Sequence, residues 1–127
     1  MKHVQIFEQE GMVMPSGRTT RVLVGDNGAV KGKYFCQGYV VIVPGGSIPL
    51  HDHEMEETYT ILCGKGLMQV GDEQQHVEEG SLVLIPAYAN HALTNTGDTD
   101  MHMMFVYAPY QIADHWEEEL GKDANHS

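Results

Sequence analysis

The sequence has no long apolar segment, because its hydrophobic residues, 42% of the 127, occur in short runs. None of these runs approaches the roughly 20 consecutive apolar residues that a membrane-spanning helix needs. The N-terminal segment MKHVQIFEQEGMVMP also lacks the apolar core and cleavage site of a secretory signal, and it carries Glu8 and Glu10. We therefore expect neither membrane insertion nor export, but a cytoplasmic location.

Cysteines and basic residues are scarce as well. Only Cys36 and Cys63 are present, both inside apolar runs, so we expect two reduced, buried thiols and no disulfide. Seven basic residues stand against 18 acidic ones, which gives a formal net charge of −11. That charge would repel phosphate backbones and anionic lipids over most of the surface, which argues against nucleic-acid and membrane partners.

Short apolar, β-branched runs are present, separated by glycine-rich turns. The runs cover residues 22–24, 34–43, 59–62, 67–70, 82–85 and 101–107. Many short strands with such turns are typical of a β-sandwich or β-barrel. The length suits one domain of roughly 100–150 residues, so we predict a single all-β domain over residues 1–127.

A helix is predicted only near the C-terminus. Asp114 is suited to cap a segment in which Trp116 and Leu120 are four residues apart. This segment would form a short helical tail on the β domain.

Histidine and glutamate gather in the segment GGSIPLHDHEMEETYTILCG. His51 and His53 are two residues apart, so they face the same side of an extended segment, and Glu57 keeps that parity. His91 follows a second apolar run that ends at Pro86, and it opens the next predicted strand. Three imidazoles and one carboxylate suit borderline first-row metals better than magnesium or calcium. We interpret the other histidines as solvated surface residues.

The glycines and proline around these residues resemble the two sequence motifs of the cupin family. The first motif, G(x)5HxH(x)3E(x)6G, is met in full by Gly45, His51, His53, Glu57 and Gly64. The second, G(x)5PxG(x)2H(x)3N, is met by Gly80, Pro86, His91 and Asn95. Tyr88 stands where this second motif usually has glycine, although a tyrosine is not favoured at positive φ.

The resemblance implies an all-β fold, a double-stranded β-helix or jelly-roll barrel of two facing antiparallel sheets. Motif 1 would lie at residues 45–64 and motif 2 at 80–95. By the same resemblance, one divalent transition metal ion (zinc, manganese, iron or nickel) would be held near one mouth of the barrel. Its ligands would be His51, His53, Glu57 and His91. The apolar wall beside the ion would be built from Ile61, Leu93, Met103 and Phe105.

Three functions fit such a site. The first is a metal-dependent lyase, isomerase or decarboxylase that moves a proton on a small carboxylate- or sugar-derived molecule. Tyr59 is the candidate acid or base, because it shares a face with Glu57 and is similar in placement to a tyrosine of cupin lyases that cleave dimethylsulfoniopropionate. A packed wall residue is the alternative role for Tyr59. The other two functions are an iron-dependent dioxygenase and a non-catalytic module that binds or senses a small molecule.

A homodimer is expected from apolar residues that a barrel of this size need not bury internally. These residues are Val4, Ile6, Phe7, Trp116 and Leu120.

Overall fold

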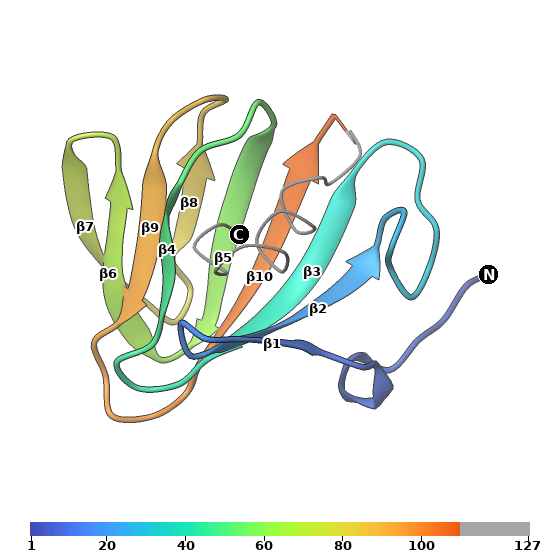
Figure 1. The fold of residues 1–127 in the computed structure, drawn as a ribbon, viewed down its shortest axis with the longest axis horizontal. Coiled ribbons are helices and arrows are strands. Elements are labelled where there is room, and N and C mark those ends of the chain that lie inside the picture. The colour runs from blue at the N-terminus through green and yellow to red at the C-terminus, as the bar shows by residue number, and fades with distance from the viewer. Residues whose placement is uncertain (110–127) are drawn as a thin grey trace.

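Two antiparallel sheets face each other in the computed structural model, which describes residues 1–109 (Figure 1). The six-stranded sheet has the order β1 (Met12–Met14), β2 (Arg18–Val24), β3 (Cys36–Ile42), β10 (Met101–Ala108), β5 (Glu56–Cys63) and β8 (Leu82–Ile85). The four-stranded sheet has the order β4 (Ser47–His51), β9 (His91–Asn95), β6 (Lys65–Val70) and β7 (Glu73–Glu78). The predicted all-β, two-sheet architecture is confirmed.

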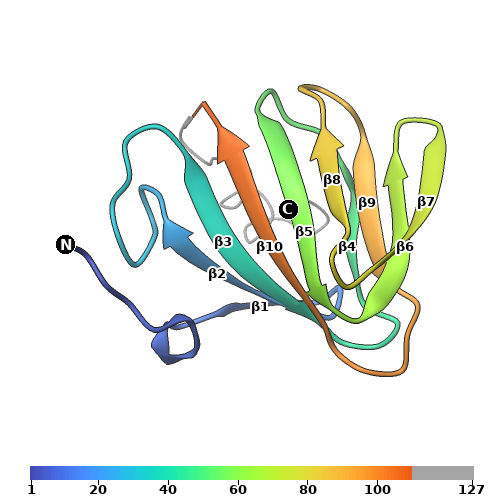
Figure 2. The ribbon, with the colours of Figure 1, turned by 180° about the vertical axis from the view of Figure 1, so that it is seen from behind.

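Strand β10 completes the larger sheet from its centre. Although it is the last strand described, it pairs with β3 on one side and with β5 on the other (Figure 2). Its register places Tyr107 opposite Cys36 on β3 and opposite Glu57 on β5. Residues that are distant in the sequence therefore share one row across the inner face of this sheet.

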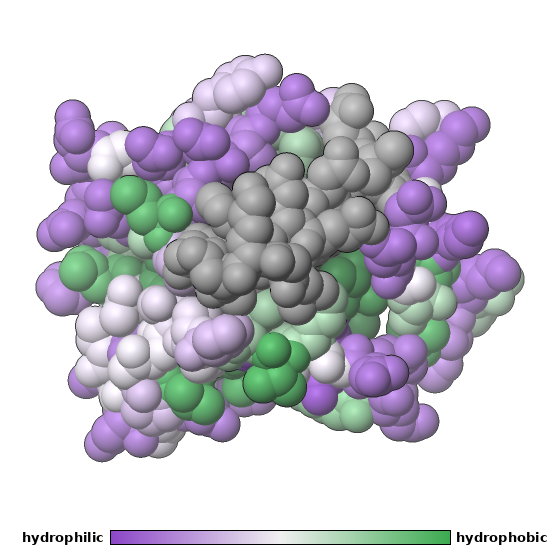
Figure 3. Space-filling model, in the orientation of Figure 1, coloured by the Kyte–Doolittle hydropathy of each residue, from purple (hydrophilic) through white to green (hydrophobic). Residues whose placement is uncertain are grey.

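The core lies between the two sheets and is filled by alternating residues of each strand. On β10, Met101, Met103, Phe105 and Tyr107 are at most 4% exposed, as the period of two in a strand requires. The four residues predicted to form the apolar wall, Ile61, Leu93, Met103 and Phe105, all lie in this core. Hydrophilic residues dominate the described surface in the view of Figure 3, with small apolar groups between them.

Asn95 ties the two sheets together at one end of the barrel. Its side-chain amide donates hydrogen bonds to the carbonyl oxygen of Ile42 on β3 at 2.8 Å and to that of Thr99 at 2.9 Å. Its side-chain oxygen accepts a hydrogen bond from the amide of Gly97 at 2.9 Å. This single side chain therefore fixes the entry to β10 and the contact between the sheets.

The N-terminal segment packs on the outer face of the six-stranded sheet. The short 3-10 helix η1 (Ile6–Glu8) presents Phe7, whose ring centroid lies 5.3 Å from that of Tyr39 in an edge-on contact. The Arg21 guanidinium lies 5.6 Å from the same ring and donates through Nε to the Gln9 carbonyl. Part of the apolar surface that we assigned to a dimer thus contacts its own chain, and the homodimer stays a prediction.

Other expectations have mixed outcomes. The predicted helix with Asp114, Trp116 and Leu120 lies outside the described residues, so the tail and the single-domain assignment stay predictions. Both cysteines are free thiols, but only Cys36 is buried, because Cys63 lies at the end of β5 where its side chain is partly exposed. Within residues 1–109, no helix has the length and hydrophobicity to cross a membrane.

Candidate metal centre

The four predicted ligands come together between the two sheets. His51 ends β4 and His91 begins β9, whereas Glu57 is the second residue of β5 in the opposite sheet. Their ligand atoms and one imidazole nitrogen of His53 all lie within 4.8 Å of one another. The cluster is thus assembled from both layers of the fold.

His53 lies with the other predicted ligands, although not because it is on the same face of a strand as His51. His53 is not on a strand, because the chain leaves β4 after His51 and crosses to the other sheet before Glu56. His53 is oriented instead by its own contacts, with Nδ1 3.1 Å from the Met55 carbonyl and Nε2 2.9 Å from Glu57 Oε1. Because the chain crosses here, His51 on β4 and Glu57 on β5 reach one point from different sheets.

Backbone carbonyls orient all three imidazoles in the same way. Nδ1 of His51 lies 2.8 Å from the Pro49 carbonyl oxygen, and Nδ1 of His91 lies 2.9 Å from that of Ala89. A carbonyl oxygen can only accept, so in each ring, including His53, Nδ1 carries the proton and donates. This tautomer leaves the Nε2 lone pairs directed at one another, which is the arrangement that metal-binding histidines require.

The side chains of the cluster do not satisfy one another's hydrogen-bonding atoms, whereas a cation would. His51 and His91 are 6% and 0% exposed, and their Nε2 atoms are buried without a hydrogen-bond partner. Glu57, 5% exposed, places Oε1 2.9 Å from His53 Nε2 and 3.3 Å from His91 Nε2. Buried polar atoms without partners are rare because they are costly, and a divalent ion would satisfy all of them.

Burial and charge shift the pKa values of the cluster in opposite directions. Burial, together with the nearby His91, lowers the pKa of His51 to about 3. For Glu57, burial alone would raise the pKa, but the adjacent imidazoles of His53 and His91 outweigh it and hold the pKa below its usual value. Burial would likewise lower the pKa of His53, but the neighbouring Glu57 carboxylate raises it. Glu57 is therefore ionised and His51 neutral at pH 7, as ligands must be.

Tyr59 lies next to this cluster, in the wall of the core. It is 2% exposed, and its ring stands edge-on to that of His91 with centroids 5.8 Å apart. It follows Glu57 on the inner face of β5, as the sequence predicts. The position suits a residue that contacts a molecule bound at the cluster, and it equally belongs to the packed core.

Tyr107 was missed by the sequence analysis although it flanks Glu57. It is 1% exposed, its ring centroid is 5.9 Å from that of His53, and it stacks on Phe105 at 6.0 Å. Burial, followed by its hydrogen bond with the Cys36 thiol, raises the pKa of Tyr107, so its phenol stays protonated. The signal was available, because Tyr107 continues the alternation of Met103 and Phe105 on β10.

Tyr88 occupies the turn before His91 in the conformation that the family normally gives to glycine. Its φ is +67°, in the left-handed region that costs a side chain about 1–2 kcal/mol. Its amide donates to the His53 carbonyl at 2.8 Å, and its side chain is 70% exposed. The turn therefore keeps its shape despite the tyrosine and links the loops that carry His53 and His91.

Comparison with known sequences places this arrangement among related proteins. A family profile described as "Cupin domain" matches residues 38–107. A Thermotoga maritima protein named "Oxalate-binding protein" is 34% identical over 64 residues, 50% of this chain and 53% of the relative. An uncharacterised protein of Methanocaldococcus jannaschii is 38% identical over 76 residues, 58% of this chain and 61% of the relative. The chain thus matches little more than half the length of these two relatives.

Solved structures share the fold. The crystal structure of a predicted oxalate decarboxylase from Thermotoga maritima superposes with a TM-score of 0.76 at 22% identity, over 85% of this chain and 99% of that one. An RmlC-like cupin from Shewanella frigidimarina superposes with a TM-score of 0.73 at 14% identity, over 90% of this chain and 96% of the other. At these identities the likeness concerns the architecture.

Proposed function

Because this chain belongs to the cupin domain family, we propose that it is a metal-dependent enzyme that moves a proton on a small carboxylate-bearing molecule. One divalent first-row metal ion would be held by four ligands, His51, His53, Glu57 and His91. The observation that carries the proposal is that the Nε2 atoms of His51 and His91 are buried without a hydrogen-bond partner, in rings oriented by backbone carbonyls. That arrangement satisfies no protein group and suits a cation.

The residues around the cluster have distinct roles in this proposal. A bound divalent ion would supply Lewis-acid polarisation of a substrate oxygen. Tyr59, beside His91, would deliver or accept the proton through its hydroxyl group. Tyr107 would keep the space next to Glu57 apolar, because its ring and that of Phe105 are stacked and buried. The apolar core around these residues would restrict water at the reacting atoms.

A carboxylate substrate is supported by the comparisons. The Thermotoga relative is named for binding oxalate, and the matched structure from the same organism is titled as a predicted oxalate decarboxylase. Both names refer to a small carboxylate, a group whose oxygens bind hard and borderline metal ions well. The first relative's name also favours a second candidate, a module that binds a small carboxylate at the same ion without converting it.

Metal content tests the proposed site. Protein purified without added metal should contain about one divalent ion per chain by elemental analysis, and the element found would separate a redox ion from zinc. His91→Ala and Glu57→Gln should each lose this ion, whereas His76→Ala, an exposed histidine on β7, should keep it. Tightly held stoichiometric metal in both ligand variants would show that the site is wrong.

Tyr59→Phe separates catalysis from binding. The change keeps the ring and removes only the hydroxyl group, so a wall residue would lose at most about 0.5–1.5 kcal/mol of stability. An acid or base would instead lose about 10²–10⁴-fold in turnover with metal content unchanged. The substrate would come from a screen of small carboxylates, including oxalate, against the metal-loaded protein. Binding without turnover in the wild type would favour the second candidate.

A further inference from the structure

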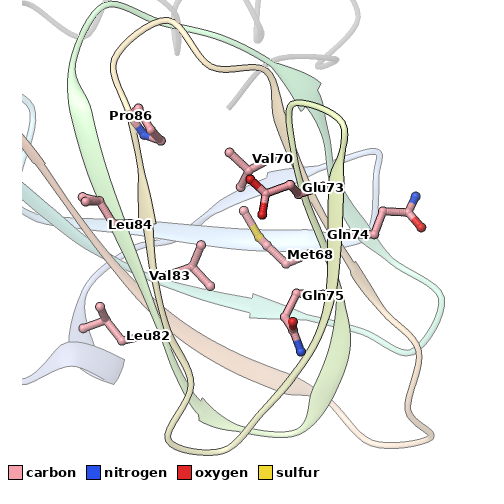
Figure 4. A pocket seen from close by; sticks show the side chains of 9 residues that line it. All are labelled: Met68, Val70, Glu73, Gln74, Gln75, Leu82, Val83, Leu84 and Pro86. Carbon is pink, nitrogen blue, oxygen red and sulfur yellow. The ribbon is translucent and has the colours of Figure 1, made fainter.

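A cavity of about 400 Å³ opens between the β6–β7 hairpin and strand β8, at the side of the barrel (Figure 4). Strands β7 and β8 are the edges of the two sheets, so the cavity lies where the barrel wall is not closed by a described strand pair. Its lining consists of Met68, Val70, Glu73, Gln74, Gln75, Leu82, Val83, Leu84 and Pro86.

Two lining residues of the cavity, Val70 and Glu73, lie in the same cross-strand row as two of the predicted metal ligands. Strand register makes His51 the partner of His91, His91 the partner of Val70, and Val70 the partner of Glu73. Directly paired residues project to the same face of a sheet, so these four side chains form one row that points into the barrel. Glu73 stands two strand spacings, about 10 Å, from His91 along this row.

The opposite wall of the cavity belongs to β8, which pairs with the strand that carries Glu57. Val83 on β8 is the register partner of Tyr59, and Ile85 is the partner of Glu57. Figure 4 shows Val83 directed toward Met68, whereas Leu82 and Leu84 are directed away from the cavity. The middle of the cavity is therefore apolar, and its β8 wall is in register with the part of β5 that carries Glu57 and Tyr59.

The polar lining residues of the cavity, Glu73, Gln74 and Gln75, all lie on its β7 side, and the only charged group among them is a carboxylate. The Glu73 carboxylate is directed across the cavity, and it has no hydrogen-bond or ion-pair partner among residues 1–109. Gln75 donates its side-chain amide to the His76 carbonyl at 3.0 Å, which leaves its side-chain oxygen as an acceptor. No lysine or arginine is among the lining residues. An anion would be repelled here, and a cationic group that donates hydrogen bonds would be held.

We propose that the side cavity is a second subsite of the metal centre and that Glu73 binds the ammonium group of an ω-amino acid. The inference rests on the proposed function, because the carboxylate of the same molecule would bind at the metal ion. The methylene chain would lie over Val70 between the two polar ends. The substrate class is thereby narrowed from small carboxylates to carboxylates with a cationic end a few carbon atoms away.

Three probes of equal carbon number test this assignment. Butyrate, γ-aminobutyrate and succinate differ at one end only, which is a methyl, an ammonium or a carboxylate group. Calorimetric titration of metal-loaded protein should rank γ-aminobutyrate about fivefold tighter than butyrate, with succinate weakest, as expected for one solvent-accessible charge pair. Equal binding of γ-aminobutyrate and butyrate would overturn the inference.

Glu73→Gln should remove this ranking by weakening γ-aminobutyrate about fivefold and tightening succinate. Glu78→Gln is the matched control, because it makes the same charge change on β7 at a position of opposite parity, and it should keep the wild-type ranking. If Glu73 only protects the edge of β7 from pairing with other chains, Glu73→Gln would leave all three affinities unchanged, which overturns the assignment.

Metal content, measured first in every sample, separates this inference from the proposed function. Full metal content with no binding of any of the three probes would overturn the subsite and leave the metal site intact. Protein that holds no metal, in wild type and variants alike, would overturn both.

Discussion

The two ends of the barrel join the same two sheets by different chemistry. At one end, Asn95 uses a neutral amide whose donors and acceptor all find backbone partners. At the other end, the ligand cluster brings together a carboxylate and three imidazoles, and the Nε2 atoms of His51 and His91 are buried without partners. The amide end is complete in the polypeptide itself, whereas the cluster, which we call the metal end, leaves buried acceptors that a cation would satisfy.

This difference assigns separate tasks to the two ends. A satisfied buried amide contributes to stability under all conditions, because both partners of each hydrogen bond belong to the chain. In the proposed metal site, the buried Nε2 atoms of His51 and His91 would cost stability until an ion binds, and binding would then contribute its free energy to the folded state. The folded state without an ion would thus be less stable because of the residues that form the proposed metal site.

Removal of the metal should reveal the largest difference between the ends. We expect a chelator to lower the free energy of unfolding of the wild type by about 3 kcal/mol when the ion is present at 100 times its dissociation constant. His91→Ala should show no such chelator effect. Denaturant titrations with and without the chelator measure both values, and an equal chelator effect in the two proteins would contradict the assignment.

Asn95→Ala should break the opposite end by a smaller amount. Loss of the side chain leaves the Ile42 carbonyl and the Gly97 amide without their partners, so we expect a cost of about 2–3 kcal/mol. The cost should be the same with and without the metal, since the amide end is independent of the ion. Asn90→Ala, whose side chain lies in the loop before His91, is the control. A cost that disappears after chelation would show that the two ends are coupled.

The sequence predicted that the four side chains would lie together, because two of the motif positions coincide with strand ends. His51 and His91 are terminal residues of β4 and β9, and these strands are neighbours in register. Period-two burial also predicted the inner residues of β5 and β9. The crossing at His53 could not be predicted, because alternation describes a strand and contains no information on where a chain changes sheets.

Strand β7 and the side cavity were missed for a related reason. β7 lies at a sheet edge and exposes all its residues except Val77, so it has no apolar alternation to detect. Glu73 and Gln75 have the polar character of loop residues, although their side chains point toward the cavity. The alternation on β10 predicts that Tyr107 faces inward, but its place beside Glu57 depends on β10 lying next to β5, which is a property of topology and not of local sequence.

Tyr88→Gly should change the free energy of unfolding least among these variants. Turns at both ends use glycine at positive φ, as at Gly45 and Gly71, whereas the turn before His91 has Tyr88 at +67°. Glycine at position 88 would relieve this strain but increase the entropy of the unfolded chain, so we expect a net gain of up to about 1 kcal/mol. Tyr88→Ala removes the ring without relieving the strain and should show no gain. Thermal unfolding of both variants checks this, and equal shifts would attribute the effect to the lost ring.

The central position of β10 affects how the chain can fold while it is being synthesised. β3 and β5 are made early, yet each leaves one edge unpaired until the strand that lies between them has left the ribosome. Nascent chains that end before residue 101 therefore expose two long strand edges, to which chaperones or other nascent chains can add. The sheet that presents Glu57 can therefore be completed only after β10 has been made and has paired with β3 and β5.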